Sequence, residues 1–245
     1  MKLGFFIKLL LFLIASALAI GAATCFLSEF HLPFPESNDA VNTNADALKY
    51  KTVIIDAGHG GEDGGASSAV GLVEKNVNLE ISKMLCDMLR ANGVNVIMTR
   101  EDDRLLYDRN VDFKGRKKKL DLAARLTVAD TTPDAVFVSI HMNSYSDIRS
   151  QGLQVWYSAN DPDSLTLAEL IQSNNKATLQ PENTRKTKAA TSSIFLLDNA
   201  TCPAVLVECG FLSNPTEAAL FETDEYKQKV AFVIFCSLTE FLHEQ

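Results

Sequence analysis

The chain has little positive charge, and this shortage excludes one large class of partner. It contains 23 lysines and arginines against 31 aspartates and glutamates, which gives a formal net charge of −8 at pH 7. A protein that binds nucleic acid needs a basic surface. The one basic run, Lys117–Lys119, stands at the start of a helical pattern, where a solvated helix face accounts for it. We therefore expect no nucleic-acid partner.

The chain also lacks internal repeats, low-complexity tracts and a clear disulfide framework. Its five cysteines leave at least one unpaired. Cys202 and Cys209 flank one strand pattern, and extended chain would separate them by roughly 23 Å, too far for a disulfide. Cys86 and Cys236 fall within helical patterns. Core packing is the expected role of these four residues.

What the chain does have, at its start, is a pattern typical of export. Lys2 and Lys8 precede an almost wholly apolar run over residues 9–20, and small residues that offer a cleavage site follow. This arrangement is typical of a signal peptide, but residues 9–27 are also about long enough to cross a bilayer as an uncleaved anchor. In both cases we expect export across the cytoplasmic membrane. The product would be secreted, wall-associated or membrane-anchored through its N-terminus.

Composition divides the chain into three parts. Residues 1–24 form the signal peptide or anchor, and the polar residues 25–49 are typical of a linker. Residues 50–245 have the length of a single domain, and 47% of the whole chain is hydrophobic, which is enough for a sizeable core.

From Lys51 onward, strand and helix patterns alternate. Strands are expected at 53–56, 94–99, 135–141, 152–157, 193–197 and 204–209, and helices at 75–91, 117–129, 164–179 and 225–243. The first strand is β-branched on both faces, as expected of a strand buried on both sides. This alternation predicts an α/β fold, with a mostly parallel twisted sheet of about six strands and helices on both faces.

Polar side chains follow three of the apolar strands. His59 lies in a glycine-rich turn after the first strand, His141 ends the third, and Glu208 comes near the end of the last. Taken alone, His59 is equally well explained as a turn residue or as a ligand. Ligands, however, bind beyond the carboxyl ends of parallel strands, so the three side chains should meet at one edge. A metal best explains such a cluster, because burying these groups is otherwise costly.

Two acidic residues compete for a third ligand position beside the histidines. Glu74 begins the predicted helix after the glycine-rich turn, where the helix dipole alone favours a glutamate. Glu208 lies among apolar residues, where a carboxylate without a function is costly. The residue pattern by itself leaves this choice open.

Five ordered segments resemble the zinc-dependent N-acetylmuramoyl-L-alanine amidases of the type-3 catalytic family, and the resemblance covers about residues 51–243. The segments are IDAGHGG (55–61), EK (74–75), VIMTR (96–100), SIHMNS (139–144) and VECGFLSNP (207–215). The resemblance implies one zinc ion per chain, with His59, Glu74 and His141 as ligands and Glu208 as the catalytic carboxylate. The reaction it implies is hydrolysis of the amide bond between N-acetylmuramic acid and the L-alanine of the stem peptide.

Three further residues are candidates for supporting roles. Asp56 and Asn143 are candidates for orienting a ligand or the substrate. Arg100 is a candidate for binding a peptide carboxylate, with pairing to Asp102 or Asp103 as the alternative.

The overall plan, a signal followed by one short catalytic domain, looks most like the sporulation and germination subgroup of this family. Members of that subgroup strip peptides from spore cortex glycan. Only ten residues separate His141 from Gly152, too few for the insertion that covers the zinc in some relatives, so we expect an unobstructed site. The expected partners are the glycan and stem peptide of peptidoglycan and an activating protein. Two alternatives remain: an inactive amidase-fold adaptor that binds the wall, and another secreted zinc hydrolase acting on peptidoglycan.

Overall fold

Strands and helices alternate along the chain, as the sequence predicts. The structure, a computed structural model, describes residues 48–108, 110 and 114–244, so the expected signal or anchor and nearly all of the linker lie outside it. The strands are β1 (Thr52–Ala57), β2 (Asn95–Met98), β3 (Ala135–Asn143), β4 (Gln154–Tyr157), β5 (Lys188–Ala189) and β6 (Ala204–Phe211). The helices are α2 (Glu74–Ala91), α3 (Lys117–Asp130), α4 (Asp163–Thr178), α5 (Phe195–Asn199), α6 (Pro215–Phe221) and α7 (Asp224–Glu244). None of these helices is both long and apolar enough to cross a membrane.

The six strands form one mostly parallel sheet, in the order β2-β1-β3-β6-β4-β5. Strands β2, β1, β3 and β6 run parallel to one another, whereas β4 runs antiparallel to β6 and carries β5 parallel to itself. The predicted α/β fold is therefore confirmed. Because β1, β3 and β6 are adjacent and parallel, their carboxyl ends lie together at one edge of the sheet.

The sequence-based assignment was wrong in one place and missed one helix. Residues 193–197, expected to be a strand, lie largely in the short helix α5, and the exposed β5 is the edge strand instead. A four-residue apolar run does not distinguish a strand from a buried helical turn by its periodicity. The missed helix, α6, begins with a recognisable signal, because Asn214 caps it and Pro215 follows.

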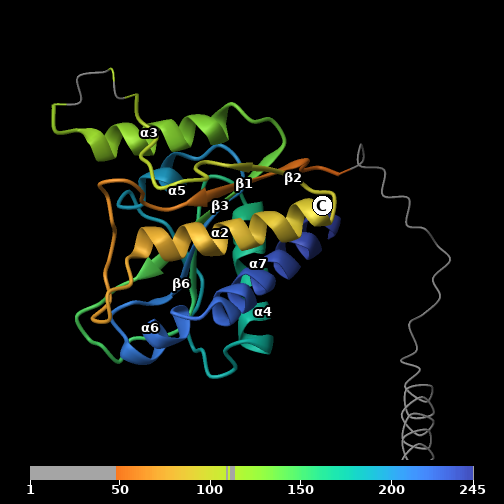
Figure 1. Cartoon of the computed structure of the whole chain (residues 1–245). Coiled ribbons are helices and arrows are strands. Elements are labelled where there is room, and N and C mark those ends of the chain that lie inside the picture. Colours follow the sequence, from red (N-terminus) through yellow and green to blue (C-terminus); the bar gives the residue numbers. More distant parts are fainter. Residues whose placement is uncertain (1–47, 109, 111–113, 245) are drawn as a thin grey trace, which may run out of the picture. The chain divides into compact units, whose positions relative to one another are not determined.

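Helices cover both faces of the sheet (Figure 1). Helices α2, α4 and α7 pack on one face, hereafter the α2 face, and α3 and α5 pack on the other, hereafter the α3 face. Alternate residues of each strand point to opposite faces. On the α2 face, the strands contribute an unbroken apolar layer down to their carboxyl ends, formed by Val53, Ile55, Val138, Ile140, Met142, Val205, Val207 and Cys209.

The α3 face is different, because each strand changes from apolar to polar along its length. Ile54, Phe137 and Leu206 pack beneath α3 and α5. The residues that follow them on the same face are Asp56 in β1, Ser139 and His141 in β3, and Glu208 in β6. The chemistry therefore gathers where the α3 face meets the carboxyl edge of the sheet.

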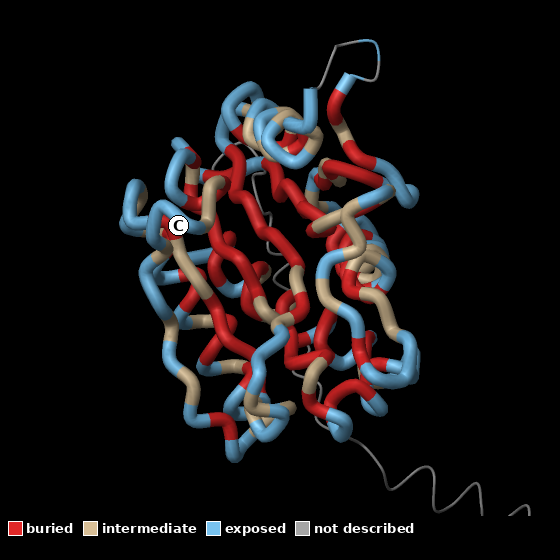
Figure 2. Tube along the Cα trace, turned by 90° about the vertical axis from the view of Figure 1, so that its left-hand side faces the viewer, coloured by how far each residue is buried: buried red, intermediate tan, exposed pale blue. Residues whose placement is uncertain are grey.

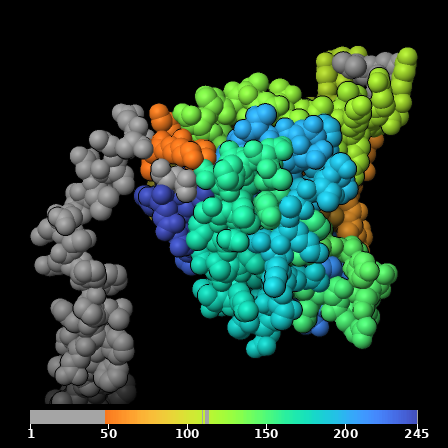
Figure 3. Space-filling view, turned by 180° about the vertical axis from the view of Figure 1, so that it is seen from behind, coloured from red at the N-terminus to blue at the C-terminus, as the bar shows by residue number. Residues whose placement is uncertain are grey.

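The interior is formed mainly by these strands, which Figure 2 shows in red along most of their length. Core packing, expected of all four described cysteines, is found for Cys86 and Cys209, which are buried on the α2 face, whereas Cys202 and Cys236 are half-buried. The start of the domain lies beside the end of α7 (Figure 3), where the rings of Tyr50 and Phe241 stack with their centroids 5.7 Å apart.

Candidate metal centre and active site

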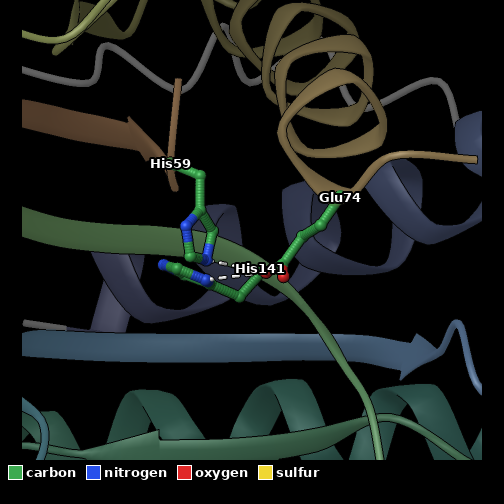
Figure 4. Close-up of side chains that lie close together, drawn as sticks. All are labelled: His59, Glu74 and His141. Atoms are coloured by element: carbon green, nitrogen blue, oxygen red, sulfur yellow. Dashed lines mark hydrogen bonds and ion pairs between the residues drawn. The ribbon is translucent and has the colours of Figure 1, made fainter. Parts of the chain in front are cut away.

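Three side chains converge at the carboxyl edge of the sheet. His59 comes from the turn after β1, Glu74 from the first turn of α2, and His141 from the end of β3, and one ligand atom of each lies within 4.8 Å of the others (Figure 4). Glu74 Oε1 is 3.3 Å from His59 Nε2 and 3.0 Å from His141 Nδ1. The structure therefore brings residues distant in sequence together. Of the two carboxylates, Glu74 is the one within contact distance of both histidines.

The backbone around these residues makes room for them. His59 itself has a φ of +61°, in the left-handed region that non-glycine residues rarely adopt. A Cβ atom on Gly58 would collide with the His141 ring, and one on Gly65 would collide with the Glu74 carboxylate. The glycine-rich turn is thus needed for the close approach of the three side chains. The sequence analysis did not identify Gly65, because no local pattern indicates that this glycine lies against Glu74.

Glu74 is held in its ionised form. The N–H of Ala66 donates to its Oε2 at 2.7 Å, and the N–H of Met142 donates to its Oε1 at 3.1 Å. Burial works against ionisation, but the hydrogen bonds and charges of His141 and His59 outweigh it and hold the pKa of Glu74 well below its usual range. Its place in the first turn of α2 adds a favourable helix dipole. Glu74 therefore provides a permanent negative charge to the cluster.

Glu208 is a second carboxylate with the opposite properties. It stands opposite His141 in the pairing of β3 with β6, and its side chain lies on the same face. Its buried Oε2 has no hydrogen-bond partner among the described residues. Burial, together with the nearby charge of Glu74, raises the pKa of Glu208 to about 7 in the metal-free site, although the two histidines oppose this. A carboxyl group with such a pKa can take up and release a proton near neutral pH.

The three converging residues fit a metal ion. Two imidazole nitrogens and one carboxylate oxygen form the usual ligand set of a catalytic zinc site and leave a position open for water. Glu208, with an unpartnered oxygen on the same edge, provides a group that such a water would satisfy. The cluster is thus a candidate metal site whose donor chemistry and space are those that a divalent cation needs.

Asp63 supports His59 from behind and was missed by the sequence analysis. Its Oδ1 lies 2.9 Å from His59 Nδ1, an ion-pair contact that is not aligned as a hydrogen bond. A carboxylate on the second nitrogen of a metal-ligating histidine fixes the ring orientation and increases the basicity of the first. An aspartate four residues after a histidine in a loop carries no sequence signal of this role.

Asn78 supports Glu74 in a similar way. One helical turn after Glu74, its Nδ2 lies 3.4 Å from Glu74 Oε1 and donates to the carbonyl of Gly58 at 3.2 Å. The contact with the carboxylate is long, so the bond to the turn is the stronger of the two. Asn78 is fully buried beside Val77. A polar residue on the apolar stripe of an amphipathic helix was the signal that could have identified it.

Asp56 lies beneath the turn in an ionic cluster. It is fully buried and accepts hydrogen bonds from Thr99, Ser139 and Arg125 at 2.6–2.7 Å. Arg125 also donates to the carbonyl of His59 at 2.7 Å. Although burial opposes it, the charge of Arg125 and the two hydroxyl groups lower the pKa of Asp56. Asp56 therefore positions Arg125, which holds the backbone of His59 in its left-handed conformation.

Arg100 lies elsewhere than a substrate contact would require. Arg100 is buried, and its guanidinium donates to backbone carbonyls, including those of Ala57 at 2.8 Å and Gly58 at 3.0 Å. It ties the turn to the sheet, and its buried side chain is not accessible to a ligand that enters from solvent. Asn143 occupies the irregular end of β3, where its Oδ1 accepts from the N–H of Ser144 at 2.8 Å.

A cavity of about 260 Å³ opens beside the candidate metal site. His59, His141 and Glu208 line one side, and apolar residues that include Leu122 and Ile194 line the other. The cavity gives a substrate direct access to the three polar groups.

Comparisons with known proteins agree on one family. Residues 53–240 match the family model for N-acetylmuramoyl-L-alanine amidase. The germination-specific N-acetylmuramoyl-L-alanine amidase of Bacillus subtilis is 34% identical over 209 residues, which cover 85% of this chain and 87% of that protein. The probable cell wall amidase LytH of Staphylococcus epidermidis is 32% identical over 204 residues, 81% of this chain and 60% of that protein. The CwlD amidase of Clostridioides difficile, solved in complex with the GerS lipoprotein, has a TM-score of 0.75 and 35% identity, covering 80% of this chain and 100% of that one.

Proposed function

Since this chain belongs to the N-acetylmuramoyl-L-alanine amidase family and is a peptidoglycan amidase, we propose that it works with one zinc ion held by His59, Glu74 and His141. The observation that carries this proposal is the convergence of the three ligand atoms within 4.8 Å. Zinc, when bound there, lowers the pKa of a water molecule toward 7 and polarises a carbonyl oxygen.

Glu208 is proposed as the catalytic acid and base. Its unpartnered Oε2 takes the proton from the attacking water and then delivers it to the nitrogen of the departing L-alanine. The cleaved bond joins the lactyl group of N-acetylmuramic acid to L-alanine. Glu208 stands opposite His141 in the pairing of β3 with β6, which puts its carboxyl group at the same edge as the proposed ligands.

Four residues have positioning roles in this proposal. Asp63 orients the His59 ring, Asp56 fixes Arg125, and Arg125 holds the His59 carbonyl. Arg100 keeps the turn against the sheet through the carbonyls of Ala57 and Gly58. Asn143, at the rim beside His141, is left as a candidate for contact with the substrate.

The cellular role is proposed from the relatives. The likeness to a germination-specific amidase extends over 85% of this chain and 87% of that protein, so we propose that the substrate is spore cortex peptidoglycan. The complex of the similar CwlD amidase with a lipoprotein supports an accessory protein partner for this chain. Both proposals require export, for which the N-terminal pattern provides the signal or anchor.

The test uses the full-length protein and peptidoglycan purified from spore cortex and from vegetative walls. Bound metal is measured by elemental analysis, and products are analysed for muropeptides and for new L-alanine amino termini. We expect about one zinc per chain and release of intact stem peptides. Glu208→Gln should retain zinc and lower the rate about 10²- to 10⁴-fold, whereas the surface control Glu222→Gln should behave as the wild type. Unchanged product formation by Glu208→Gln would contradict the catalytic assignment, and wild-type protein without zinc would contradict the metal assignment.

A further inference from the structure

One cation beside the active-site edge is not used by the amidase mechanism. Arg185 lies in the connection between α4 and α5, which runs over the surface of the domain (Figure 3) and is mostly exposed. Its own side chain is partly buried. Its contacts connect it to Gln154 of β4, the residue that stands opposite Glu208 in the sheet.

The strand register places Arg185 one side chain away from Glu208. Gln154 of β4 stands directly opposite Glu208 of β6 in the antiparallel pair, so the two side chains lie on the same face, with Cβ atoms about 5 Å apart. Arg185 Nη1 donates to Gln154 Oε1 at 3.2 Å. The guanidinium is therefore the next group along the sheet edge after Glu208 and Gln154.

The guanidinium is also held in place. Its carbon lies 4.3 Å from the centroid of the Phe211 ring, at the end of β6, and its Nε donates to the carbonyl of Gln151 at 2.6 Å. Stacking and two hydrogen bonds fix the plane of an arginine fork before a ligand arrives. Less conformational entropy is then lost on binding.

The charge of Arg185 is not neutralised by a salt bridge. Among the described residues no carboxylate lies within ion-pair distance of it. Two other cations near the edge do have carboxylate partners, because Arg125 pairs with Asp56, and Lys118 lies 3.5 Å from Asp63. The acid whose charge acts on Arg185 is Glu217, and its two oxygens are occupied by the N–H groups of Gly152 and Phe211.

A fixed guanidinium without a salt-bridge partner suits a carboxylate, which it can bind through two parallel N–H donors. In a stem peptide, the residue after L-alanine is D-glutamate joined through its γ-carboxyl group, so its α-carboxyl group is free or amidated. That group lies one residue beyond the L-alanine whose amide bond is cleaved.

Resting on the amidase function proposed above, we propose that Arg185 forms a carboxylate subsite for this second stem-peptide residue. Arg185 selects substrates with a free α-carboxylate over substrates with an α-carboxamide. It is a specificity residue that contacts the peptide and takes no part in bond cleavage.

The experiment compares two glycan substrates that differ only in this group, carboxylate or carboxamide. Full-length wild-type protein should cleave the carboxylate form with a kcat/KM about tenfold higher, because a charged hydrogen-bond pair is lost with the amide. Arg185→Gln should reduce this ratio to about one through KM, with the kcat on the carboxamide form unchanged. Arg185→Lys, which keeps the charge but loses the planar fork, should retain part of the ratio. Lys229→Gln on α7, which removes a distant positive charge, should leave the ratio as in the wild type.

Calorimetric binding of both substrates to the Glu208→Gln protein gives a second readout that needs no hydrolysis. It separates the two proposals, because the subsite predicts tighter binding of the carboxylate form even where the protein cleaves neither. If the Glu208→Gln protein, which retains Arg185, binds both forms equally tightly, the subsite proposal is wrong. It is also wrong if Lys118→Gln abolishes the kcat/KM preference for the carboxylate form and Arg185→Gln does not. Melting temperatures and zinc content of every variant show whether a loss reflects unfolding.

Discussion

The two faces of the sheet differ in where their strands stop being apolar. On the α2 face, apolar residues continue to the carboxyl ends, as in Val138, Ile140 and Met142 of β3. On the α3 face the same strand changes from Phe137 to Ser139 and then to His141. One strand therefore contributes to a hydrophobic core on one side and to a polar site on the other.

This difference separates two energetic roles. Burial of apolar surface on the α2 face stabilises the fold without directing any atom at the substrate. On the α3 face, buried charges such as Asp56 and Arg125 add little net stability, because desolvation offsets their attraction. They fix the geometry of the turn that carries His59. The α2 face should therefore tolerate apolar changes without loss of chemistry, and the α3 face should not.

The largest effect is expected from Arg125→Met. This substitution leaves Asp56 fully buried without its partner charge, and breaking a buried pair costs about 3–5 kcal/mol of unfolding free energy. It also releases the His59 carbonyl, so zinc affinity should fall with stability. Urea unfolding and metal titration measure the two effects.

Two variants control this prediction. Arg149→Met removes an arginine from the exposed ion pair with Asp147 and should produce no measurable change. The double variant Asp56→Asn, Arg125→Met should lose less stability than Arg125→Met alone, since no unpaired charge remains. Equal stability losses in the single and the double variant would sink the ion-pair explanation.

On the opposite face, Leu85→Ala should lower stability by about 2–5 kcal/mol, because it leaves a cavity in a fully buried position of α2. Zinc affinity and kcat/KM, measured well below the melting temperature, should stay at wild-type values. Leu85→Ala and Arg125→Met should therefore lose similar amounts of stability, but only Arg125→Met should lose zinc affinity. A tenfold loss of zinc affinity in Leu85→Ala would show that the two faces are not separable in this way.

A smaller effect is expected from Asp63→Asn, which removes the carboxylate behind His59. Loss of such a supporting group lowers metal affinity about 10- to 100-fold, with little change in the unfolding free energy of the metal-free protein. Competition with a chelator measures the affinity. Glu62→Gln changes the neighbouring exposed carboxylate, which pairs with Lys117, and should bind zinc as the wild type does. If the two variants bind zinc equally well, the contact with His59 has no role in the site.

The smallest effect concerns acid pH. The folded protein lowers the pKa of Asp56 below its ordinary value of 3.8, so the unfolded state binds a proton more readily. The contribution of Asp56 to stability is therefore fully present above about pH 4 and is lost as the pH falls from there toward the folded pKa. Unfolding free energies measured from pH 6 to pH 3 should fall less steeply in Asp56→Asn than in the wild type. Identical slopes would mean that Asp56 is not linked to acid unfolding.

Much of the fold could be predicted because its signals are local. The alternation of apolar strands with amphipathic helices indicated the mostly parallel sheet. The positions of His59, His141 and Glu208 at the ends of apolar strands indicated the edge of the sheet that carries the candidate site. The error at residues 193–197 has the same origin, since the apolar run Ile194–Leu197 fits a strand and a helical turn equally well. The choice between strand and helix there depends on packing beneath α3, which no local pattern specifies.

The supporting residues could not be predicted, because their roles depend on contacts between distant segments. Arg100 was a candidate for binding a peptide carboxylate or for pairing with Asp102 or Asp103, yet it folds back onto the carbonyls of Ala57 and Gly58. The opposite holds for Arg185, which stood in a polar stretch without any motif. Its link to Glu208 through Gln154 follows from the antiparallel pairing of β4 with β6, and a sequence does not state which strands become neighbours.

The sequence by itself determined the family, the alternating fold and the side chains of the candidate metal site, because the spacing of apolar residues and the order of motifs are properties of the linear chain. The family resemblance already implied that Glu74 is a ligand and Glu208 the catalytic carboxylate, and only the tertiary structure decided how the surroundings of these two carboxylates differ. Glu74 lies 3.0 Å from His141 and stays ionised, whereas Glu208 has a raised pKa and a buried Oε2 with no hydrogen-bond partner among the described residues. The physical reason is that the ionisation of a carboxylate depends on the charges, hydrogen bonds and water around it, and folding alone brings these together.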